Sequence, residues 1–229
     1  FHLNPYFARS PGDVWKWLTE GPDAHAHRHV IWSNLQTTLG DAVLGYVAGT
    51  IAAVVAAALF VMSRSVERSL MPIALALRTV PLVAMTPLIT LVFGRGKMGV
   101  TVIAGIVTFF PTLVNMVQGL RSAPSDTLLL MRACDASPLT TLRKVQLPSA
   151  LPSLFASAKI AAPGAMLGAV LAEWLATGKG LGYLMLTAPS TSDFDALWAA
   201  VVTITLVAVA VYAAIGFIDD WMKIVRKRS

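Results

Sequence analysis

Five long apolar stretches, separated by short polar segments, make up most of the chain. Their centres carry almost no charge: residues 42–62 hold no ionisable side chain except Tyr46, and residues 98–120 hold none. Each stretch reaches the roughly 20 residues that a helix needs to cross a bilayer. The pattern therefore predicts an all-α polytopic membrane protein with five membrane helices, at about Ser33–Met62, Leu70–Phe93, Met98–Leu120, Ala150–Ala176 and Ala196–Met222.

The composition agrees with a membrane location. Of 229 residues, 56% are hydrophobic and 13% are charged, with a mean hydropathy of +0.68. An ordinary soluble domain carries about 25% charged residues, so the composition excludes disorder and argues against a soluble enzyme. The net charge of +6 does not indicate nucleic-acid binding, because the basic residues form short clusters between apolar runs rather than a stripe with stacking aromatics.

The Lys and Arg residues between the apolar stretches are divided unequally between the two sides of the membrane. Ten lie on the side of the C-terminal tail and six on the other. The positive-inside rule then makes the C-terminus cytoplasmic. Residues 1–32 are expected to be an extracytoplasmic N-terminal segment, followed by a transmembrane domain at residues 33–229. If the native N-terminus is cytoplasmic, a sixth helix is expected upstream of Phe1.

The polar segment at residues 1–32 contains three histidines that alternate along the chain. His25, His27 and His29 share one face only if the backbone is extended. No carboxylate or cysteine is spaced to complete a metal site with them, so we interpret the segment as a solvated loop and predict no metal site. The single cysteine, Cys134, cannot form an intrachain disulfide.

The segment at residues 121–149 is the longest loop on the cytoplasmic side. Ser125-Asp126 is a helix-start signal, and an uninterrupted run follows it. Pro138 fits the first turn of a second run, which we expect Pro148 to end. The loop therefore predicts two short helices that face the cytosol.

The second of these short helices carries a mostly apolar stripe beside two basic residues, Arg143 and Lys144. Two interpretations fit this stripe. It is either an interfacial helix that lies on anionic lipid or a docking element for a cytoplasmic partner. The stripe consists of Leu139, Leu142, Val145 and Gln146.

The same loop resembles a known family. Residues 131–152 read MRACDASPLTTLRKVQLPSALP, which resembles the EAA loop of ABC importer permeases and, in its LPSALP ending, the nitrate, sulfonate and taurine branch. Further stretches agree in order between Ser10 and the C-terminus. The resemblance implies the six-helix transmembrane domain of a type I ABC importer in the bacterial cytoplasmic (inner) membrane. These further stretches are residues 77–82, 87–88, 109–115, 119–122 and 172–183.

The resemblance implies that the short loop helices are coupling helices that dock into a cleft on an ATP-binding subunit. Two departures stand out: the family's Glu-Ala-Ala triplet falls on residues 129–131, which are Leu, Leu and Met, and its glycine falls on Asp135. Because Asp tolerates left-handed backbone, we expect the turn to be retained. With Pro138, Asp135 is also expected to form the N-cap region of the second helix. The candidate docking residues are Asp135, Ser137, Pro138, Leu139, Leu142, Arg143, Val145 and Pro148.

The chain lacks a phosphate-binding loop, which requires Gly, four residues and then Gly-Lys-Ser/Thr. Gly96-Lys97 is followed by Met98, and Gly178-Lys179 by Gly180. We therefore expect no catalytic residue and no cofactor in this chain, with ATP and Mg²⁺ on a separate ATPase. The resemblance also implies the other partners, which are two ATPase copies, a second and identical permease chain, an extracytoplasmic solute-binding protein and membrane lipid.

Prolines and polar residues inside the apolar stretches mark a candidate translocation pathway. Pro81 and Pro87 are expected to disrupt the Leu70–Phe93 helix, which frees carbonyl groups that protein or a water-lined path must satisfy. The alternative is that these residues form buried kinks and interhelical hydrogen bonds. Pro148 and Pro152 are expected to form an elbow between the coupling helix and the next membrane helix. The candidate pathway residues are Met85, Thr86, Thr90 and Asn115.

Ionisable residues also lie near the ends of the apolar stretches. Arg78 is taken as a residue near the cytoplasmic end whose side chain snorkels to the interface or forms a salt link. Glu173 lies near the external end, where we expect it to pair with Lys179 or, together with Lys179, to contact the solute-binding protein.

The resemblance implies a permease subunit that forms the pathway of an ATP-driven importer and works by alternating access. The solute is expected to be a small molecule of the sulfonate, nitrate, taurine or pyrimidine-precursor type. The alternative is an ATP-independent secondary transporter or a channel. The sequence shows neither the selectivity ring of a channel nor the inverted repeats and interior carboxylates of many secondary transporters.

Overall fold

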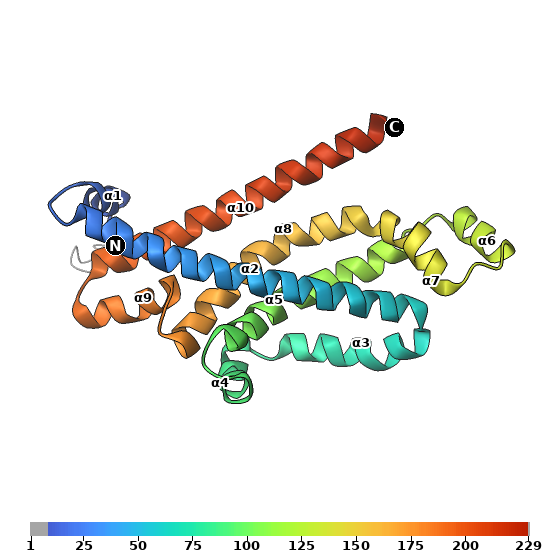
Figure 1. Cartoon of the computed structure of the whole chain (residues 1–229), viewed down its shortest axis with the longest axis horizontal. Coiled ribbons are helices and arrows are strands. Elements are labelled where there is room, and N and C mark those ends of the chain that lie inside the picture. Colours follow the sequence, from blue (N-terminus) through green and yellow to red (C-terminus); the bar gives the residue numbers. More distant parts are fainter. Residues whose placement is uncertain (1–8, 229) are drawn as a thin grey trace, which may run out of the picture.

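A computed structural model describes residues 9–228, with side chains described for residues 9–221, and this part of the chain contains helices and no strand. Figure 1 shows an elongated bundle with α1 and α9 at one end and α6 and α7 at the other. In order, the helices are α1 (Pro11–Thr19), α2 (Ala24–Met62), α3 (Arg64–Thr79), α4 (Leu82–Phe93), α5 (Lys97–Arg121), α6 (Ser125–Ala133), α7 (Pro138–Thr141), the π-helix η1 (Leu142–Gln146), α8 (Leu147–Ala172), the π-helix η2 (Glu173–Thr177), α9 (Leu181–Thr187), the 3₁₀-helix η3 (Ala188–Thr191) and α10 (Phe194–Arg228).

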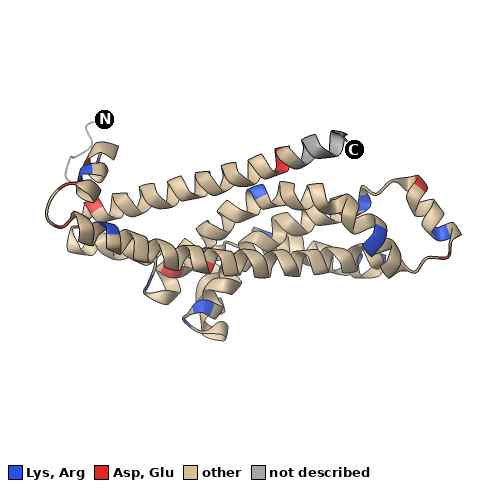
Figure 2. Cartoon of the chain, turned by 45° about the horizontal axis from the view of Figure 1, so that its top comes forward, with Lys and Arg blue, Asp and Glu red and all other residues tan. Residues whose placement is uncertain are grey.

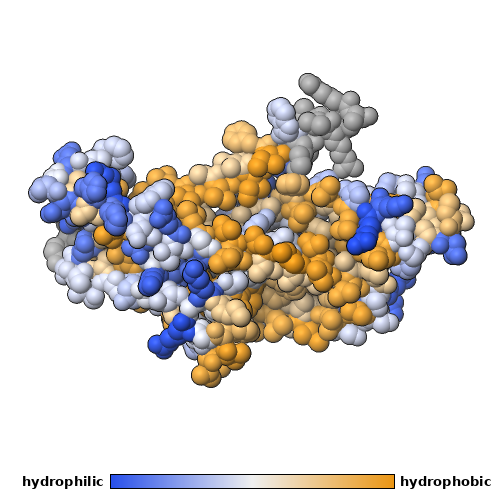
Figure 3. Space-filling view, in the orientation of Figure 1, coloured by the Kyte–Doolittle hydropathy of each residue, from blue (hydrophilic) through white to orange (hydrophobic). Residues whose placement is uncertain are grey.

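The helices confirm a polytopic all-α membrane fold. Four helical segments within the described residues are long and apolar enough to cross a bilayer, namely Ala24–Met62, Lys97–Arg121, Pro138–Thr177 and Phe194–Trp221. An apolar band covers the middle of the molecule in Figure 3, and Figure 2 shows Lys and Arg on the segments at both ends with little charge along the middle.

The second apolar stretch, Leu70–Phe93, is broken rather than straight. Helices α3 and α4 meet at an angle of 108°, and the break falls at Val80-Pro81, as the prolines predicted. Val80 is extended, with φ −72° and ψ 127°, because a residue before proline avoids the helical region. Pro87, by contrast, lies within α4 without ending it. With only 12 residues, α4 is about 18 Å long and cannot cross the bilayer alone.

Small residues bring α2, α5 and α8 close together. A Cβ atom on Gly49 of α2 would lie 1.9 Å from Thr108 Oγ1 and 2.4 Å from the Gly105 carbonyl oxygen, both on α5. One turn earlier, Gly45 lies against Ala104 in the same way. The absence of side chains at these positions lets the two backbones touch, which is how membrane helices gain packing energy without a hydrophobic driving force.

The N-terminal region differs from the solvated loop that the sequence predicted. Helix α2 begins at Ala24 rather than near residue 33, so His25, His27 and His29 lie on a helix. The His27 ring stacks on Trp17 at a centroid distance of 4.0 Å, and its Nδ1 lies 2.9 Å from the Trp17 carbonyl oxygen. Among the described residues, no three His, Cys, Asp or Glu side chains gather to hold a metal ion.

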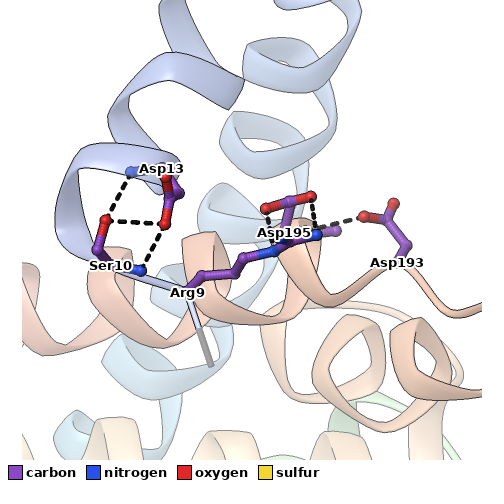
Figure 4. A network of polar contacts seen from close by, with 6 residues as sticks. Arg9, Ser10, Asp13, Asp193 and Asp195 are labelled. Atoms are coloured by element: carbon purple, nitrogen blue, oxygen red, sulfur yellow. Dashed lines mark hydrogen bonds and ion pairs between the residues drawn. The ribbon is translucent and has the colours of Figure 1, made fainter. Parts of the chain in front are cut away.

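Polar contacts fix the short helix α1 to the start of α10 (Figure 4). Arg9 Nε lies 2.8 Å from Asp195 Oδ1. The Ser10 hydroxyl caps α1 by accepting from the Asp13 amide, and the Ser10 amide and hydroxyl both donate to the Asp13 carboxylate. The Ser10 backbone amide and hydroxyl hold the pKa of Asp13 below its usual value. The contacts join Arg9 and the start of α1 to the start of α10.

Candidate functional site

Helices α6 and α7 and the π-helix η1 form a projection that we call the docking hairpin, residues 125–146. It extends beyond the bundle at the end opposite α9 (Figure 1). The turn between α6 and α7 contains Asp135 with φ +50°, so the expected left-handed turn is confirmed. The N-cap of α7 is Ser137, whose hydroxyl accepts from the Thr140 amide, and Pro138 occupies the first helical position as predicted.

The helix does not end at Pro148, contrary to the sequence prediction. The backbone is helical without a break from Pro138 to Thr177, and the wider π turn at Leu142–Gln146 immediately precedes the proline. A proline inside an α-helix removes a hydrogen bond and clashes with the preceding turn, whereas a π turn offers local relief. The expected elbow at Pro148 and Pro152 is therefore not a break in the helix, and one continuous helix leaves the docking hairpin.

Most of the predicted docking residues lie on the surface of the hairpin. Leu139 is 49% exposed, and Val145 is half-buried. Leu142 differs, because it is 5% exposed and packs in a cluster with Phe60 and Leu120. Leu142 thus anchors the hairpin to α2 and α5 and does not offer a contact surface. The exposed members are Asp135, Ser137, Pro138, Leu139, Arg143 and Pro148.

The structure adds two exposed apolar residues that the sequence analysis did not include in the docking set. Leu129 and Leu130 of α6 are 59% and 62% exposed. Both occupy positions of the triplet that the family fills with Glu and Ala. The departure from the motif was therefore the sequence feature from which they could have been identified. The hairpin therefore presents apolar surface from both of its arms.

A second feature is a cleft at the break between α3 and α4, which we call the break cleft. Its volume is about 430 Å³, and it is lined by residues 77–82, Met85, Ile106, Val107, Phe110, Pro111 and Ile160. Helices α3, α4, α5 and α8 thus all contribute to it. The cleft exists because Pro81 turns α4 away from the axis of α3.

Of the four predicted pathway residues, only Met85 lines the break cleft. Thr86 is fully buried and donates to the Leu82 carbonyl at 3.0 Å. The Thr90 hydroxyl donates to the Pro87 carbonyl at 3.0 Å, and Asn115 Nδ2 donates to the Pro111 carbonyl at 2.8 Å. These three side chains satisfy carbonyl groups of their own helices beside prolines. Their role in a pathway stays a prediction.

The third feature is a buried carboxylate at the end opposite the docking hairpin. Glu173 has no exposed surface, and its Oε2 accepts from the Gly182 amide at 2.7 Å and from the Thr38 hydroxyl at 3.0 Å. Thr38 in turn accepts from the Leu181 amide at 2.9 Å. We call this network the Glu173 clasp, because it ties η2, α2 and the start of α9 together.

Glycine is required where the clasp closes. A Cβ atom on Gly180, whose φ is +93°, would lie 2.2 Å from the Glu173 carboxyl carbon. Glu173 forms no ion pair with Lys179 in the described part of the chain. With its carboxylate covered, Glu173 cannot touch another protein directly in this conformation, while Lys179 is exposed.

Comparison with known sequences gives consistent relatives. Residues 45–224 match the family described as "Binding-protein-dependent transport system inner membrane component". A probable ABC transporter permease of Haemophilus influenzae is 33% identical over 86% of this chain and 78% of its own length. The riboflavin transport system permease RibX of Chloroflexus aurantiacus is 30% identical over 91% of this chain and 75% of its own length.

Relatives of 27–28% identity carry names for other solutes. They include permeases for formylaminopyrimidine in Halalkalibacterium halodurans, for aliphatic sulfonates in Bacillus subtilis and for nitrate in Leptolyngbya laminosa. They cover 87%, 83% and 80% of this chain, and 80%, 66% and 66% of their own lengths. Among solved structures, a chain of the inward-facing MetNI methionine ABC transporter matches with a TM-score of 0.68 at 20% identity, over 88% of this chain and 98% of that one. That match shows a shared fold.

Proposed function

Because this chain belongs to the family of inner-membrane components of binding-protein-dependent transport systems, we propose that it forms the translocation pathway of an ATP-driven importer. The observation that carries the coupling part of the proposal is the docking hairpin. It projects from one end of the bundle, presents Leu129, Leu130 and Leu139 to solvent, and is anchored to the membrane helices by Leu142. Exposed leucines on an ordered projection are suited to a protein partner.

In this proposal a separate ATPase subunit binds the docking hairpin and carries ATP and Mg²⁺. Closure of two ATPase copies moves the hairpins of two permease chains, which we take to be identical. The continuous helix from Pro138 to Thr177 would transmit this motion through the membrane, because a helix behaves as a rigid lever in such transitions. Alternating access follows if the break cleft opens first to one side and then to the other.

The orientation follows from the distribution of charge. We place the docking hairpin and the C-terminus in the cytoplasm, in accordance with the positive-inside rule. Helix α1 and the Glu173 clasp then lie at the extracytoplasmic end, where the exposed Lys179 and the segment before α2 are positioned to meet a solute-binding protein. The solute class includes sulfonates, nitrate, taurine and pyrimidine precursors, which overlaps with the names of the relatives.

Capture of the ATPase tests the proposal. We expect full-length tagged chain, isolated from mild-detergent membranes, to retain a P-loop ATPase identifiable by mass spectrometry. Leu139→Asp and Arg143→Glu are each expected to reduce the recovered ATPase at least about tenfold, because each places a repulsive group in the contact and the few hot-spot residues at the centre of an interface contribute about 2 kcal/mol or more. Leu142 is unsuitable for this test, since its replacement would disturb the core.

The matched control is Trp15→Asp, which changes an exposed apolar residue on α1, at the other end of the molecule. Its ATPase recovery should equal that of the wild type. Equal recovery from the Leu139→Asp and Arg143→Glu variants would show that the hairpin is not the docking element. Failure to recover any ATPase from the wild type, under conditions that keep a known transporter complex intact, would favour the ATP-independent transporter.

A further inference from the structure

The depth of Arg78 differs from what its position in the sequence suggested. It lies 14 residues after Arg64, the first residue of α3, and so about 21 Å along the helix axis. The break cleft that it lines also contacts α5 at Ile106 and Phe110, in the middle of that helix. Ile106 lies about 14 Å from Lys97 at one end of α5, and Phe110 about 16 Å from Arg121 at the other.

Arg78 therefore lies near the centre of the membrane, too far from either end of the bundle for its side chain to snorkel to an interface. The interpretation of Arg78 as a residue near the cytoplasmic end does not hold. A charge at this depth is costly in lipid, and such residues usually face a protein interior or a water-filled cavity. Arg78 lies on the wall of the break cleft, and its side chain is exposed on the protomer.

The surroundings of Arg78 leave its charge available to a ligand. Within residues 9–221, Arg78 is exposed and forms no ion pair or side-chain hydrogen bond, and the guanidinium group is always protonated in proteins. The walls opposite it, formed by Met85, Ile106, Phe110 and Ile160, are apolar. A single positive charge in an otherwise apolar cleft attracts one anionic group and leaves the rest of a small ligand in apolar contact.

The broken helix adds to the positive electrostatic potential that Arg78 creates in the cleft. Helix α4 begins at the cleft directly after Pro81, and its N-terminus has no side-chain cap. The positive end of a helix dipole favours negative charge, and transporters with interrupted helices use such N-termini to hold anionic substrate groups. Arg78 and this N-terminus act in the same direction, although Arg78 carries the larger charge.

We propose that Arg78 in the break cleft is the anion-binding group of the translocation pathway, and that the transported solute bears a negatively charged group such as a sulfonate, nitrate or carboxylate. This proposal rests on the proposed function, because a solute-binding group presupposes that the chain forms a translocation pathway. It favours the nitrate-like and sulfonate-like part of the solute class over the uncharged part. The proposal can be tested without the ATPase or the binding protein, by a probe that reaches the cleft from either side of the membrane.

The probe is the charge preference of thiol labelling at Met85, the predicted pathway residue that lines the cleft. The full-length chain carries Cys134→Ser, which removes the exposed cysteine of the docking hairpin, together with Met85→Cys. In nanodiscs, labelling rates are compared for the anionic ethylsulfonate and the cationic ethyltrimethylammonium methanethiosulfonate reagents. Each rate is divided by the reagent's rate with a free thiol.

We expect the anionic reagent to be favoured at Met85→Cys, and Arg78→Gln to lower the anion-to-cation ratio by about tenfold or more, because removing a unit charge within several ångströms acts oppositely on the two reagents. Arg78→Lys should keep most of the preference. Added ethanesulfonate should slow labelling when Arg78 is present and have little effect in Arg78→Gln, whereas uncharged riboflavin should not reproduce this charge-dependent protection.

Arg64→Gln is the matched control, since Arg64 lies on the same helix but outside the cleft. Its labelling ratio should equal that of the unmodified cleft. A ratio that Arg78→Gln leaves unchanged would overturn the proposal, as would the absence of labelling by both reagents, which would show that no aqueous cleft reaches Met85. Loss of ATPase capture by the hairpin variants, with an unchanged charge effect, would separate the proposed function from this inference.

Discussion

Gly49→Ala is expected to destabilise the folded chain far more than Gly40→Ala, although both substitutions add one methyl group to the same helix. At Gly49 the new Cβ would lie 2.4 Å from the Gly105 carbonyl oxygen and 1.9 Å from Thr108 Oγ1. The threonine side chain can rotate, but the carbonyl belongs to the backbone of α5. Helices α2 and α5 would have to move apart along their whole contact.

The expected cost at Gly49 is roughly 3 kcal/mol, at the upper end of the range for overpacking. For a chain of this size, that loss lowers the thermal midpoint by about 6–12 °C. Gly40 meets nothing within 4 Å, so alanine there is expected to be neutral or slightly stabilising through helix propensity. Thermal unfolding followed by size-exclusion chromatography in detergent measures both variants. Equal midpoints would show that α2 and α5 do not touch at Gly49.

Local features of the fold were predictable because they depend on neighbouring residues alone. The left-handed turn at Asp135 follows from the few residue types that accept positive φ, and the break at Val80-Pro81 follows from the steric effect of proline on the preceding residue. The long helices were predictable from the apolar runs, because a run of apolar residues is also a property of neighbouring residues. Each of these features is decided within one or two turns of chain.

Features that depend on contacts between distant segments were not predictable in the same way. Pro148 carries a helix-stop signal, but the π turn before it and packing around Leu142 keep the helix continuous. The polar segment around His27 was predicted to be a loop, yet it forms the first turns of α2, and His27 stacks on Trp17. In each case tertiary packing outweighed a local preference.

The candidate sites show the same division. The docking hairpin was found from its loop and motif, whereas the burial of Leu142 could not be read from its helical stripe, because a stripe does not indicate what covers it. Arg78 was placed at the wrong depth because its helix was taken to start at Leu70 rather than Arg64. Glu173 was recognised as unusual, but its partner Thr38 is 135 residues away.

The continuous helix between the docking hairpin and the Glu173 clasp connects two of these sites. Within it, α8 is flanked by the two π-helices, Leu142–Gln146 and Glu173–Thr177. π turns are rare and are often found at functional positions. A displacement of the hairpin would therefore reach the clasp through the helix axis, and the clasp would carry it to α2 and α9 through the Thr38 and Gly182 hydrogen bonds. The strength of the clasp then matters for both stability and coupling.

Glu173→Ala is the second substitution with a large expected effect. It removes the acceptor of the Gly182 amide and leaves a cavity below the Gly180–Gly182 turn. The Thr38 hydroxyl has a second acceptor in the Asn34 carbonyl at 3.1 Å, whereas the Gly182 amide has no second acceptor among the described residues. An orphaned buried donor, the lost hydrogen bond and the cavity together are expected to cost about 3–5 kcal/mol.

Glu173→Gln provides the matched control, because its side-chain carbonyl oxygen can replace Oε2 as the acceptor of the Gly182 amide and its side chain fills nearly the same volume. We expect Glu173→Gln to keep most of the stability and Glu173→Ala to lose it, measured by the same thermal assay. Hydrogen exchange adds a local readout: the Leu181 and Gly182 amides should exchange faster in Glu173→Ala than in Glu173→Gln. If both variants exchange at the wild-type rate, the carboxylate does not hold the turn, and the link from the docking hairpin to α9 would have to run through apolar packing alone.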